Sequence, residues 1–336
     1  MLVAELVGQR EFRLVEQAVE PPGPGEVQVR VGAVGICGSD VHSYSEGGIG
    51  DTPCIYPMVL GHEPAGTVVK TGDGVTGWSP GDRAALEPAI YCYHCEFCRS
   101  GRHNICANIK FLSNAGYPGF FREFVNLPAT NVLAIPPEMS LELATVAEPL
   151  AVALHSLQFA GLTGGESVAV FGAGPIGLLT IASLKAAGAG RIWAVEPVAH
   201  RREMAIAMGA DVALDPNQVD PSKEISNVDV AIDCAAKQNT HNWAFRVLKN
   251  GGRMLLTGIH SEAVVGFEVS HMRRKEIAIF NVRRSNHETH DALDFLKARP
   301  ELFTPMITHR RPLRDIVEAF KLVENYADGV GKLVVV

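Results

Sequence analysis

The spacing of hydrophobic and polar positions changes partway along the chain, and the change predicts two kinds of structure. Before about residue 150, short apolar stretches are separated by turns rich in glycine and proline. Three of these stretches predict strands: 27–36, 65–72 and 120–127. The first region is therefore expected to consist mostly of β-strands joined by loops.

From residue 166 the pattern becomes an alternation of short apolar strands with segments of helical periodicity. The strand 167–172 is followed by the helix 175–188, and the strand 191–196 by the helix 199–209. Such an alternation predicts a parallel sheet covered by helices on both faces. About six strands fit between Ser167 and Val282, which is the size of one doubly wound domain.

The last part of the chain does not continue this alternation. It holds two amphipathic segments, 289–298 and 313–325, and ends in the apolar stretch GKLVVV. These segments are too few for a domain of their own, so we expect them to pack against the first region. The predicted domains are 151–282, and a discontinuous domain formed by 1–150 and 283–336.

Composition and charge narrow the class of protein. The 336 residues are 47% hydrophobic, which is enough for two cores, and the net charge of -7 gives no basic field for nucleic acid. No apolar run reaches the roughly 18 residues of a membrane helix, and Glu5, Arg10 and Glu11 interrupt the start where a signal peptide would be apolar. We expect a cytoplasmic protein with no nucleic-acid or membrane partner.

A glycine-rich turn, FGAGPIG, places Gly172, Gly174 and Gly177 between a predicted strand and a predicted helix. In this context the glycines let the backbone approach a pyrophosphate at the helix N-terminus, as in a Rossmann domain; a turn used only for packing is the alternative. Glu196 ends the next strand and would repel a 2'-phosphate, which favours NAD over NADP. Arg201 and Arg202 lie close enough in sequence to offset part of that repulsion. The predicted cofactor-binding residues are Gly172, Gly174, Pro175, Ile176, Gly177, Glu196, Arg201, Thr257, Gly258 and Ile259.

Four of the seven cysteines fall within fifteen residues, as C-x2-C-x2-C-x7-C. They are Cys92, Cys95, Cys98 and Cys106. Four thiolates at this spacing can enclose a zinc ion and leave no position open, which predicts a structural zinc site. An iron–sulfur cluster and four unrelated thiols are the alternatives.

A further set of candidate metal ligands is scattered along the first region. Cys37 lies in GICGSDVH, His62 and Glu63 lie in GHEPAG, and Glu148 lies in AEPL. Residue type and spacing alone do not separate this set from ordinary core side chains.

These motifs occur in one order: GICGSDVH, GHEPAG, the four-cysteine segment, EPL and GAGPIG. In that order they resemble the zinc-containing medium-chain dehydrogenases, and most of all the branch of sorbitol and related polyol dehydrogenases, over essentially the whole chain. The resemblance implies an α/β protein with a GroES-like β-rich catalytic domain and a doubly wound Rossmann domain. It also implies a catalytic and a structural zinc ion, NAD as cofactor, and a homodimer or homotetramer.

The resemblance implies roles for the scattered set. In this family the positions of Cys37 and His62 hold the catalytic zinc, and in the sorbitol branch the position of Glu63 supplies a third ligand. The position of Glu148 contacts the zinc directly or through its water, so either glutamate can be the direct ligand. A hydroxyl at Ser39 and an imidazole at His42 would relay the substrate proton to solvent.

The substrate contacts implied by the family are only partly present. Arg283 matches an arginine of the sorbitol branch, whereas Arg284 stands in place of a tyrosine. Tyr44 is displaced by one position, Phe111 matches a pocket aromatic, and Asn114 stands where threonine is common. Arg284 can bind a carboxylate or phosphate of the substrate by donating hydrogen bonds to it. Alternatively, it can face solvent or a subunit interface.

The sequence therefore predicts a zinc-dependent dehydrogenase that oxidises a secondary hydroxyl of a polyol and passes hydride to NAD. A sugar-acid or polyol-phosphate dehydrogenase of the same family is one alternative, and a non-catalytic dinucleotide-binding regulator is another. The other cysteines and histidines receive no ligand role: Cys54 and Cys234 are expected as buried apolar side chains, and His103, His241 and His271 as solvated or structural.

Overall fold

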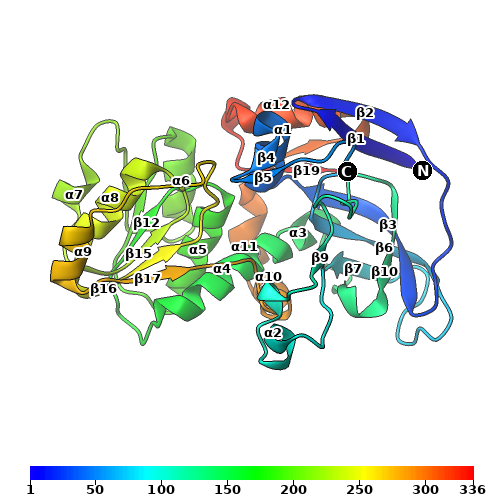
Figure 1. Cartoon of the computed structure of the whole chain (residues 1–336), viewed down its shortest axis with the longest axis horizontal. Helices are drawn as coiled ribbons and strands as arrows, with labels where there is room; N and C mark the ends of the chain where they lie inside the picture. Colours follow the sequence, from blue (N-terminus) through cyan, green and yellow to red (C-terminus); the bar gives the residue numbers. More distant parts are fainter. The chain divides into compact units, whose positions relative to one another are not determined.

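The computed structural model describes residues 1–336, which fold into two compact units (Figure 1). Unit 1 contains Met1–Glu148 and Thr289–Val336, and unit 2 contains Pro149–Glu288. The end of the chain thus returns to the unit with which it begins.

Unit 1 is built on a seven-stranded sheet in the order β11-β7-β6-β3-β19-β18, with β10 also paired to β3. All pairs are antiparallel except β18 with β19, which is parallel. The strands are β3 (Glu26–Gly35), β6 (Glu63–Thr71), β7 (Arg83–Leu86), β10 (Phe124–Pro128), β11 (Val132–Ala134), β18 (Ile307–Arg311) and β19 (Lys332–Val335). Because β19 pairs with β3, the C-terminal segment completes the sheet of the first region.

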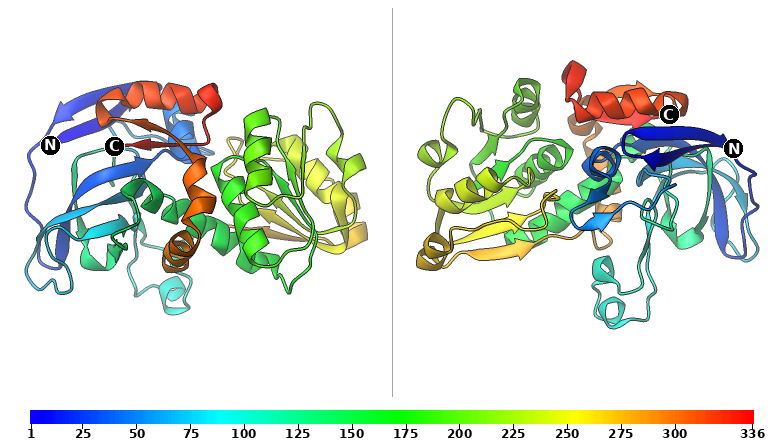
Figure 2. Two further views of the ribbon diagram at one scale, coloured as in Figure 1. Left: turned by 180° about the vertical axis from the view of Figure 1, so that it is seen from behind. Right: turned by 45° about the horizontal axis from the view of Figure 1, so that its top comes forward.

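A hairpin of β1 (Leu2–Gly8) and β2 (Glu11–Glu16) covers part of this unit. Its Phe12 ring lies 4.9 Å from Phe320 of the helix α12 (Ile316–Glu324), between ring centroids. Figure 2 shows the hairpin in blue beside α12 in red, at opposite ends of the sequence. Apolar side chains of the hairpin, the sheet and α12 form one buried core.

The remaining elements of unit 1 are short. Two small sheets are formed by β4 (Gly48–Ile49) with β5 (Thr52–Pro53) and by β8 (Ala89–Ile90) with β9 (Lys110–Phe111). The helices are α1 (Gly38–Glu46), α2 (Glu96–Arg99), α3 (Leu141–Ala144), α10 (Thr289–Ala298) and α11 (Pro300–Phe303), with short 3-10 turns at His103–Ile105, Ala129–Asn131, Thr304–Met306, Leu313–Asp315 and Ala327–Gly329.

Unit 2 is a six-stranded parallel sheet in the order β14-β13-β12-β15-β16-β17. The strands are β12 (Val168–Phe171), β13 (Ile192–Val195), β14 (Val212–Leu214), β15 (Val228–Asp233), β16 (Leu248–Leu256) and β17 (Ala278–Asn281). All four residues of β12 are buried, as expected for a central strand with helices on both faces. In chain order the arrangement reads 3-2-1-4-5-6, which is the doubly wound order.

The helices of unit 2 cover this sheet: α5 (Pro175–Ala186), α6 (Ala199–Ala207), α7 (Pro221–Glu224), α8 (Gln238–Val247) and α9 (Val269–Lys275), while α4 (Ala147–Ala160) begins at the boundary of the two units. One helical stretch, Leu141–Ala160, is long and apolar enough to cross a membrane, but 67% of its apolar window is buried inside the protein. That burial is the pattern of a core helix. The predicted fold class, a β-rich domain joined to a doubly wound α/β domain, is confirmed.

Candidate functional site

The four clustered cysteines of unit 1 come together as one group. Their sulfur atoms all lie within 4.8 Å of one another, and the distances from Cys92 Sγ are 3.4 Å to Cys106 Sγ and 4.0 Å to Cys98 Sγ. Four sulfurs at metal–sulfur bonds of about 2.3 Å around a tetrahedral zinc ion would be about 3.8 Å apart. The group therefore fits a zinc ion in both donor type and size.

The chain around these sulfurs is arranged to hold negative charge. The backbone N–H of Cys95 donates to Cys92 Sγ at 3.4 Å, and that of Cys92 donates to Cys106 Sγ at 3.5 Å. Hydrogen bonds, first that of the His94 backbone, lower the pKa of Cys92 to about 5, whereas burial raises the pKa of Cys98 to about 12. Four thiolates this close repel one another, so a bound cation is what lets all of them ionise.

A second group forms where β3 and β6 pair. Gly35 and Glu63 are partners in the antiparallel register, so Cys37, two residues after Gly35, lies beside His62 and Glu63. The ligand atoms of these three side chains lie within 4.8 Å of one another, and His62 and Glu63 are buried. Thiolate, imidazole and carboxylate are all zinc ligands, and a three-ligand set leaves a position for substrate.

Gly35 makes the room that this group needs. A Cβ at position 35 would lie 2.1 Å from Glu63 Oε2, far inside contact distance. Any other residue there would displace the carboxylate, so the glycine is required by close packing.

Asp40 orients the group of Cys37, His62 and Glu63 through contacts with the backbone and with the His62 ring. Its Oδ2 accepts the backbone N–H of Cys37 at 3.1 Å, and its Oδ1 accepts that of Gly61 at 3.0 Å and lies 3.3 Å from His62 Nδ1. Burial opposes ionisation, but the His62 ring and the two N–H groups hold the pKa of Asp40 below its ordinary value. Ser113, which sequence reasoning missed, donates its hydroxyl to the same Oδ1 at 3.3 Å. A fixed carboxylate beside the ring sets the direction of the imidazole.

Lys332 is a second residue that sequence reasoning missed. It begins β19, is 1% exposed, and pairs its ammonium with Glu63 Oε2 while donating to the Ile36 carbonyl at 3.1 Å. In the sequence it is one polar residue in an apolar terminal strand, which gives no sign of a role. The sheet pairing of β19 with β3 is what brings it to the group.

Glu148 stands in the first turn of α4, near this group but outside the compact set. Burial raises the pKa of Glu148 to about 8, and the negative charge of Glu63 adds to the rise. The carboxylate that shares the compact set with Cys37 and His62 is therefore Glu63.

The two residues predicted to move the proton lie on α1. Ser39 Oγ is 3.3 Å from Nε2 of the predicted zinc ligand His62. His42 lies one turn further along and pairs its Nδ1 with Glu46 Oε1 at 2.9 Å, on the more exposed side of the helix. Glu46 is a further partner that the sequence did not single out.

The three candidate substrate residues of unit 1 are placed differently from one another. Phe111 is buried with its ring centroid 5.5 Å from that of His62, whereas Asn114 is exposed in the turn that follows. Tyr44 is fully buried and packs its ring at 5.6 Å from Phe12 and 4.9 Å from Phe320. Tyr44 therefore belongs to the core, because its side of α1 faces α12, and this corrects its predicted role as a substrate contact.

The glycine-rich turn of unit 2 joins β12 to α5. Gly172 has a φ of 92°, and a Cβ on Gly177 would lie 1.9 Å from the Gly172 carbonyl oxygen, so both must be glycine for the turn to close. A Cβ on Gly174 would meet only Arg201, at 3.9 Å. Gly174 caps α5, with Pro175, Ile176 and Gly177 in its first turn, so the space above it is where a phosphate can approach the helix N-terminus.

Glu196 is bound to this turn. Its Oε2 accepts the N–H of Ala173 at 2.7 Å and its Oε1 that of Val198 at 2.9 Å, and the residue is 4% exposed. Arg201 is buried next to Gly174, while Arg202 turns to Asp215 at 3.3 Å. The carboxylate thus orders the turn as well as carrying the negative charge expected to disfavour a 2'-phosphate.

The other predicted residues of unit 2 follow strand ends. The N–H groups of Thr257 and Gly258 donate to the Asp233 carbonyl at 3.0 and 2.8 Å, and Ile259 is exposed. Arg283 and Arg284 follow β17; Arg283 is exposed and Arg284 is half-buried with a φ of 55°. Their contact with a substrate stays a prediction.

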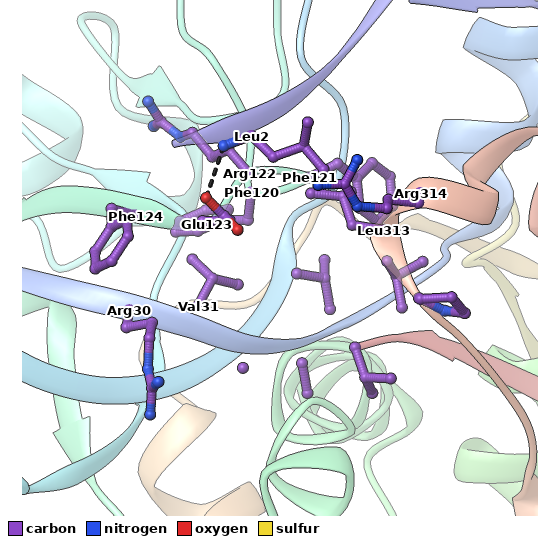
Figure 3. A pocket seen from close by; sticks show the side chains of 16 residues that line it. Leu2, Arg30, Val31, Phe120, Phe121, Arg122, Glu123, Phe124, Leu313 and Arg314 are labelled. Atoms are coloured by element: carbon purple, nitrogen blue, oxygen red, sulfur yellow. Dashed lines mark hydrogen bonds between the residues drawn. The ribbon is translucent and has the colours of Figure 1, made fainter. Parts of the chain in front are cut away.

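One cavity of unit 1, about 350 Å³, is lined by none of the metal-binding residues (Figure 3). It is lined by β3, by the segment that carries Phe121 and Arg122, and by Leu313 and Arg314. Glu123 at its edge accepts the backbone N–H of Leu2 at 2.7 Å. None of the candidate zinc ligands lines it, so it is not the site of the predicted chemistry.

Comparison with known proteins gives the same picture over the whole chain. Residues 23–137 match the alcohol dehydrogenase GroES-like domain, and residues 175–298 match the zinc-binding dehydrogenase domain. A sorbitol dehydrogenase from Macaca fascicularis is 34% identical over 332 residues, which cover 96% of this chain and 92% of the relative.

Two solved structures are also similar throughout. One is a zinc-binding dehydrogenase from Sinorhizobium meliloti 1021 bound to NADP, at 29% identity and a TM-score of 0.91, covering 100% of this chain and 98% of that one. The other is L-idonate 5-dehydrogenase from Escherichia coli K-12, at 27% identity and a TM-score of 0.92, covering 100% and 97%.

Proposed function

Because the chain belongs to the zinc-dependent medium-chain alcohol dehydrogenase family, in its sorbitol dehydrogenase-like branch, we propose that it oxidises a secondary hydroxyl of a polyol to a ketone, reversibly, with NAD as the hydride acceptor. Zinc and a nicotinamide dinucleotide are the cofactors of this oxidoreductase. The observation that supports a catalytic role is the compact set of Cys37, His62 and Glu63. A regulator without activity would have no need to keep a three-ligand set beside a closed four-cysteine set.

Bound zinc supplies a Lewis acid that lowers the pKa of a substrate hydroxyl, and bound nicotinamide supplies the hydride acceptor. The residues of the chain do the rest of the work. Asp40 holds His62 in one orientation, and Lys332 neutralises Glu63 so that the buried group is not overcharged. The group of Cys37, His62 and Glu63 thereby stays polar, which suits a substrate with neighbouring hydroxyls.

The substrate proton leaves by way of α1. Ser39 Oγ, at 3.3 Å from His62 Nε2, is the hydroxyl at the group, and His42 one turn away faces Glu46 at 2.9 Å. A hydroxyl passes a proton by accepting one and donating another, and an imidazole can take up that proton and release it to solvent. We assign Ser39 and His42 these two steps.

NAD is the proposed dinucleotide because Glu196 carries a buried carboxylate at the turn. A 2'-phosphate brought near it would meet like charge. Arg201, buried beside Gly174, favours the opposite choice, and a similar structure binds NADP. The ratio of kcat/KM with NAD to kcat/KM with NADP therefore measures whether the Glu196 carboxylate or the Arg201 guanidinium has the larger effect.

The neutral polyol is preferred over an anionic substrate, with Arg283 holding a neighbouring hydroxyl. Arg284 supports the second candidate, a sugar acid or polyol phosphate, since a guanidinium binds such anions in a bidentate manner. The likeness to an enzyme named for L-idonate, a carboxylate, points the same way. We further propose a cytoplasmic homodimer or homotetramer; the free state of all seven cysteines agrees with a reducing compartment.

The test is a comparison of kcat/KM for ethanol, a four- to six-carbon polyol, a sugar acid and a polyol phosphate, with both cofactors. A polyol far above ethanol supports the proposal, because a site built to bond hydroxyls penalises their absence. Cys37→Ser, as the control, should abolish turnover of every substrate. Ethanol equal to the polyol would refute the diol-binding site, and an anion advantage lost in Arg284→Tyr would establish the second candidate.

A further inference from the structure

Three side chains of unit 2 meet behind the segment predicted to touch the cofactor. Asp233 ends β15, His241 lies on α8, and His260 follows β16 by four residues (Figure 1). One oxygen or ring nitrogen from each lies within 4.8 Å of those of the other two. The sequence analysis gave none of them a ligand role and expected His241 to be solvated or structural, because the three residues belong to no motif.

Several buried polar atoms of this group make no hydrogen bond within the protein. Asp233 and His241 are 0% exposed, and no hydrogen bond reaches Asp233 Oδ2, either nitrogen of His241 or either nitrogen of His260. Leaving a buried polar atom without a partner costs about 1–3 kcal/mol. Several such atoms facing one another are therefore a cost that a bound ligand can remove.

The geometry between Asp233 and His241 is compatible with two ligands of one ion. Asp233 Oδ2 and His241 Nε2 are 2.9 Å apart, yet neither makes a hydrogen bond. Two ligand atoms at the tetrahedral angle around a zinc ion, each at about 2.05 Å, would be about 3.3 Å apart, so a small separation of the two atoms makes room for the ion. The two atoms can thus be directed at a common point rather than at each other.

His260 argues against a simple Asp–His pair as the whole arrangement. Its ring centroid is 4.7 Å from that of His241, and its nitrogens are buried. A neutral imidazole carries one N–H that needs an acceptor, and two adjacent protonated rings would repel each other. Coordination satisfies one nitrogen of each ring at once.

The other oxygen of Asp233 is already fixed. Oδ1 accepts the N–H groups of Ala235 and Ala236, each at 3.1 Å, and the hydroxyl of Thr240 at 3.0 Å. Such bonds hold the carboxylate in place and leave Oδ2 as its single open position. This is how a ligand is oriented before a metal arrives.

We propose that Asp233, His241 and His260 bind a divalent transition-metal ion of the zinc type, at a site separate from the two sets in unit 1. Two imidazoles and one carboxylate suit zinc and its neighbours and are poor ligands for calcium or magnesium. The ion would tie the segment after β16 to α8. That segment is otherwise held by Gln238, which exchanges hydrogen bonds of 2.6 and 2.8 Å with Gly266.

Metal content tests this site independently of any activity. Untagged protein is equilibrated against a fixed concentration of free Zn²⁺, and bound zinc per chain is measured for the native chain, His260→Ala and His241→Phe. His290→Ala is the control, because His290 is an exposed residue of α10. We expect three ions in the native chain and the control, and two in each variant of the site.

A second measurement guards against a misfolded variant. Zn²⁺ is titrated into protein whose two unit 1 sites are filled, and the melting temperature is followed. A ligand that binds only the folded state raises it. The native chain should respond and His260→Ala should not. Two ions in the native chain, or an unchanged count in His260→Ala, would overturn the proposal whatever the enzyme's activity.

Discussion

Lys332 and Glu63 form a buried ion pair, each side chain 1% exposed, on paired parts of the unit 1 sheet. The lysine neutralises a carboxylate that also belongs to the compact set with Cys37 and His62. The ion pair therefore stabilises the metal-free protein and also involves Glu63, one of the predicted zinc ligands.

Lys332→Met should destabilise the metal-free protein by about 3–5 kcal/mol, since it leaves a buried charge unpaired. Zinc can take over as the partner of Glu63, so the loss in zinc-loaded protein should be smaller. Urea denaturation with and without chelator measures both, with exposed Lys321→Met as the control. An equal loss of stability with and without zinc would show that Lys332 does not stabilise the Glu63 carboxylate.

Cys95→Ser should remove one zinc ion per chain and lower the melting temperature while leaving kcat per folded molecule largely unchanged. A closed four-sulfur site stabilises its lobe and does not touch substrate. Cys54→Ser is the matched control, because Cys54 lies outside both candidate zinc sets and its Sγ donates to the Ser43 carbonyl at 3.7 Å. A large fall in kcat with the ion count intact would contradict the structural role.

Glu196 should be tested with two substitutions, because it both repels a phosphate and accepts two backbone N–H groups. Glu196→Gln keeps an acceptor and removes the charge, so kcat/KM with NADP should rise, by roughly tenfold for each 1.4 kcal/mol of repulsion removed. Glu196→Ala also loosens the turn and should weaken both cofactors. If Gln leaves the NAD to NADP ratio unchanged, the carboxylate does not select the cofactor.

Glu148 makes the stability of the metal-free protein depend on pH. Its folded pKa of about 8 lies above the ordinary 4.5, so between these values the folded state holds a proton that the unfolded state has lost. Stability should therefore fall as pH rises from 4.5 to 8, by up to about 1.4 kcal/mol per pH unit. Glu148→Gln should flatten this slope, and exposed Glu138→Gln should not. A slope that survives in Glu148→Gln would assign it to another group.

Gly35→Ala should empty the three-ligand set and leave the four-cysteine set filled, because the new methyl would lie 2.1 Å from Glu63 Oε2. Loss of one zinc ion together with all turnover is the expected result. Gly38→Ala is the neighbouring control, since a Cβ there meets nothing within 4 Å. Full activity in Gly35→Ala would mean that the carboxylate is not needed where it lies.

The fold was predictable because it depends on periodic patterns. The alternation after residue 166 gave the doubly wound sheet, and the glycines of FGAGPIG gave the turn before α5. The scattered set was identified only through a family resemblance, because Cys37 and His62 come together by the pairing of β3 with β6, which no local pattern encodes.

What the sequence missed has the same cause. Lys332 arrives through β19, and His241 and His260 meet Asp233 only once α8 and β16 are packed. Tyr44 was expected to contact substrate because of the family resemblance, which does not show that its side of α1 packs in the core against Phe12 and Phe320. Contacts between distant segments are set by tertiary packing, and single-residue chemistry cannot foresee them.

The four sulfurs of the cysteine cluster are about as close to one another as they would be around a shared zinc ion, with Cys92 Sγ 3.4 Å from Cys106 Sγ. When the ion leaves, nothing separates these thiols, and the one with a pKa of about 5 is a thiolate at neutral pH. An oxidant can then join them before metal returns. Bound zinc thus protects the four cysteines from oxidation to disulfides. If the zinc is lost in air, the cysteines can oxidise, and only a reductant then restores the zinc site.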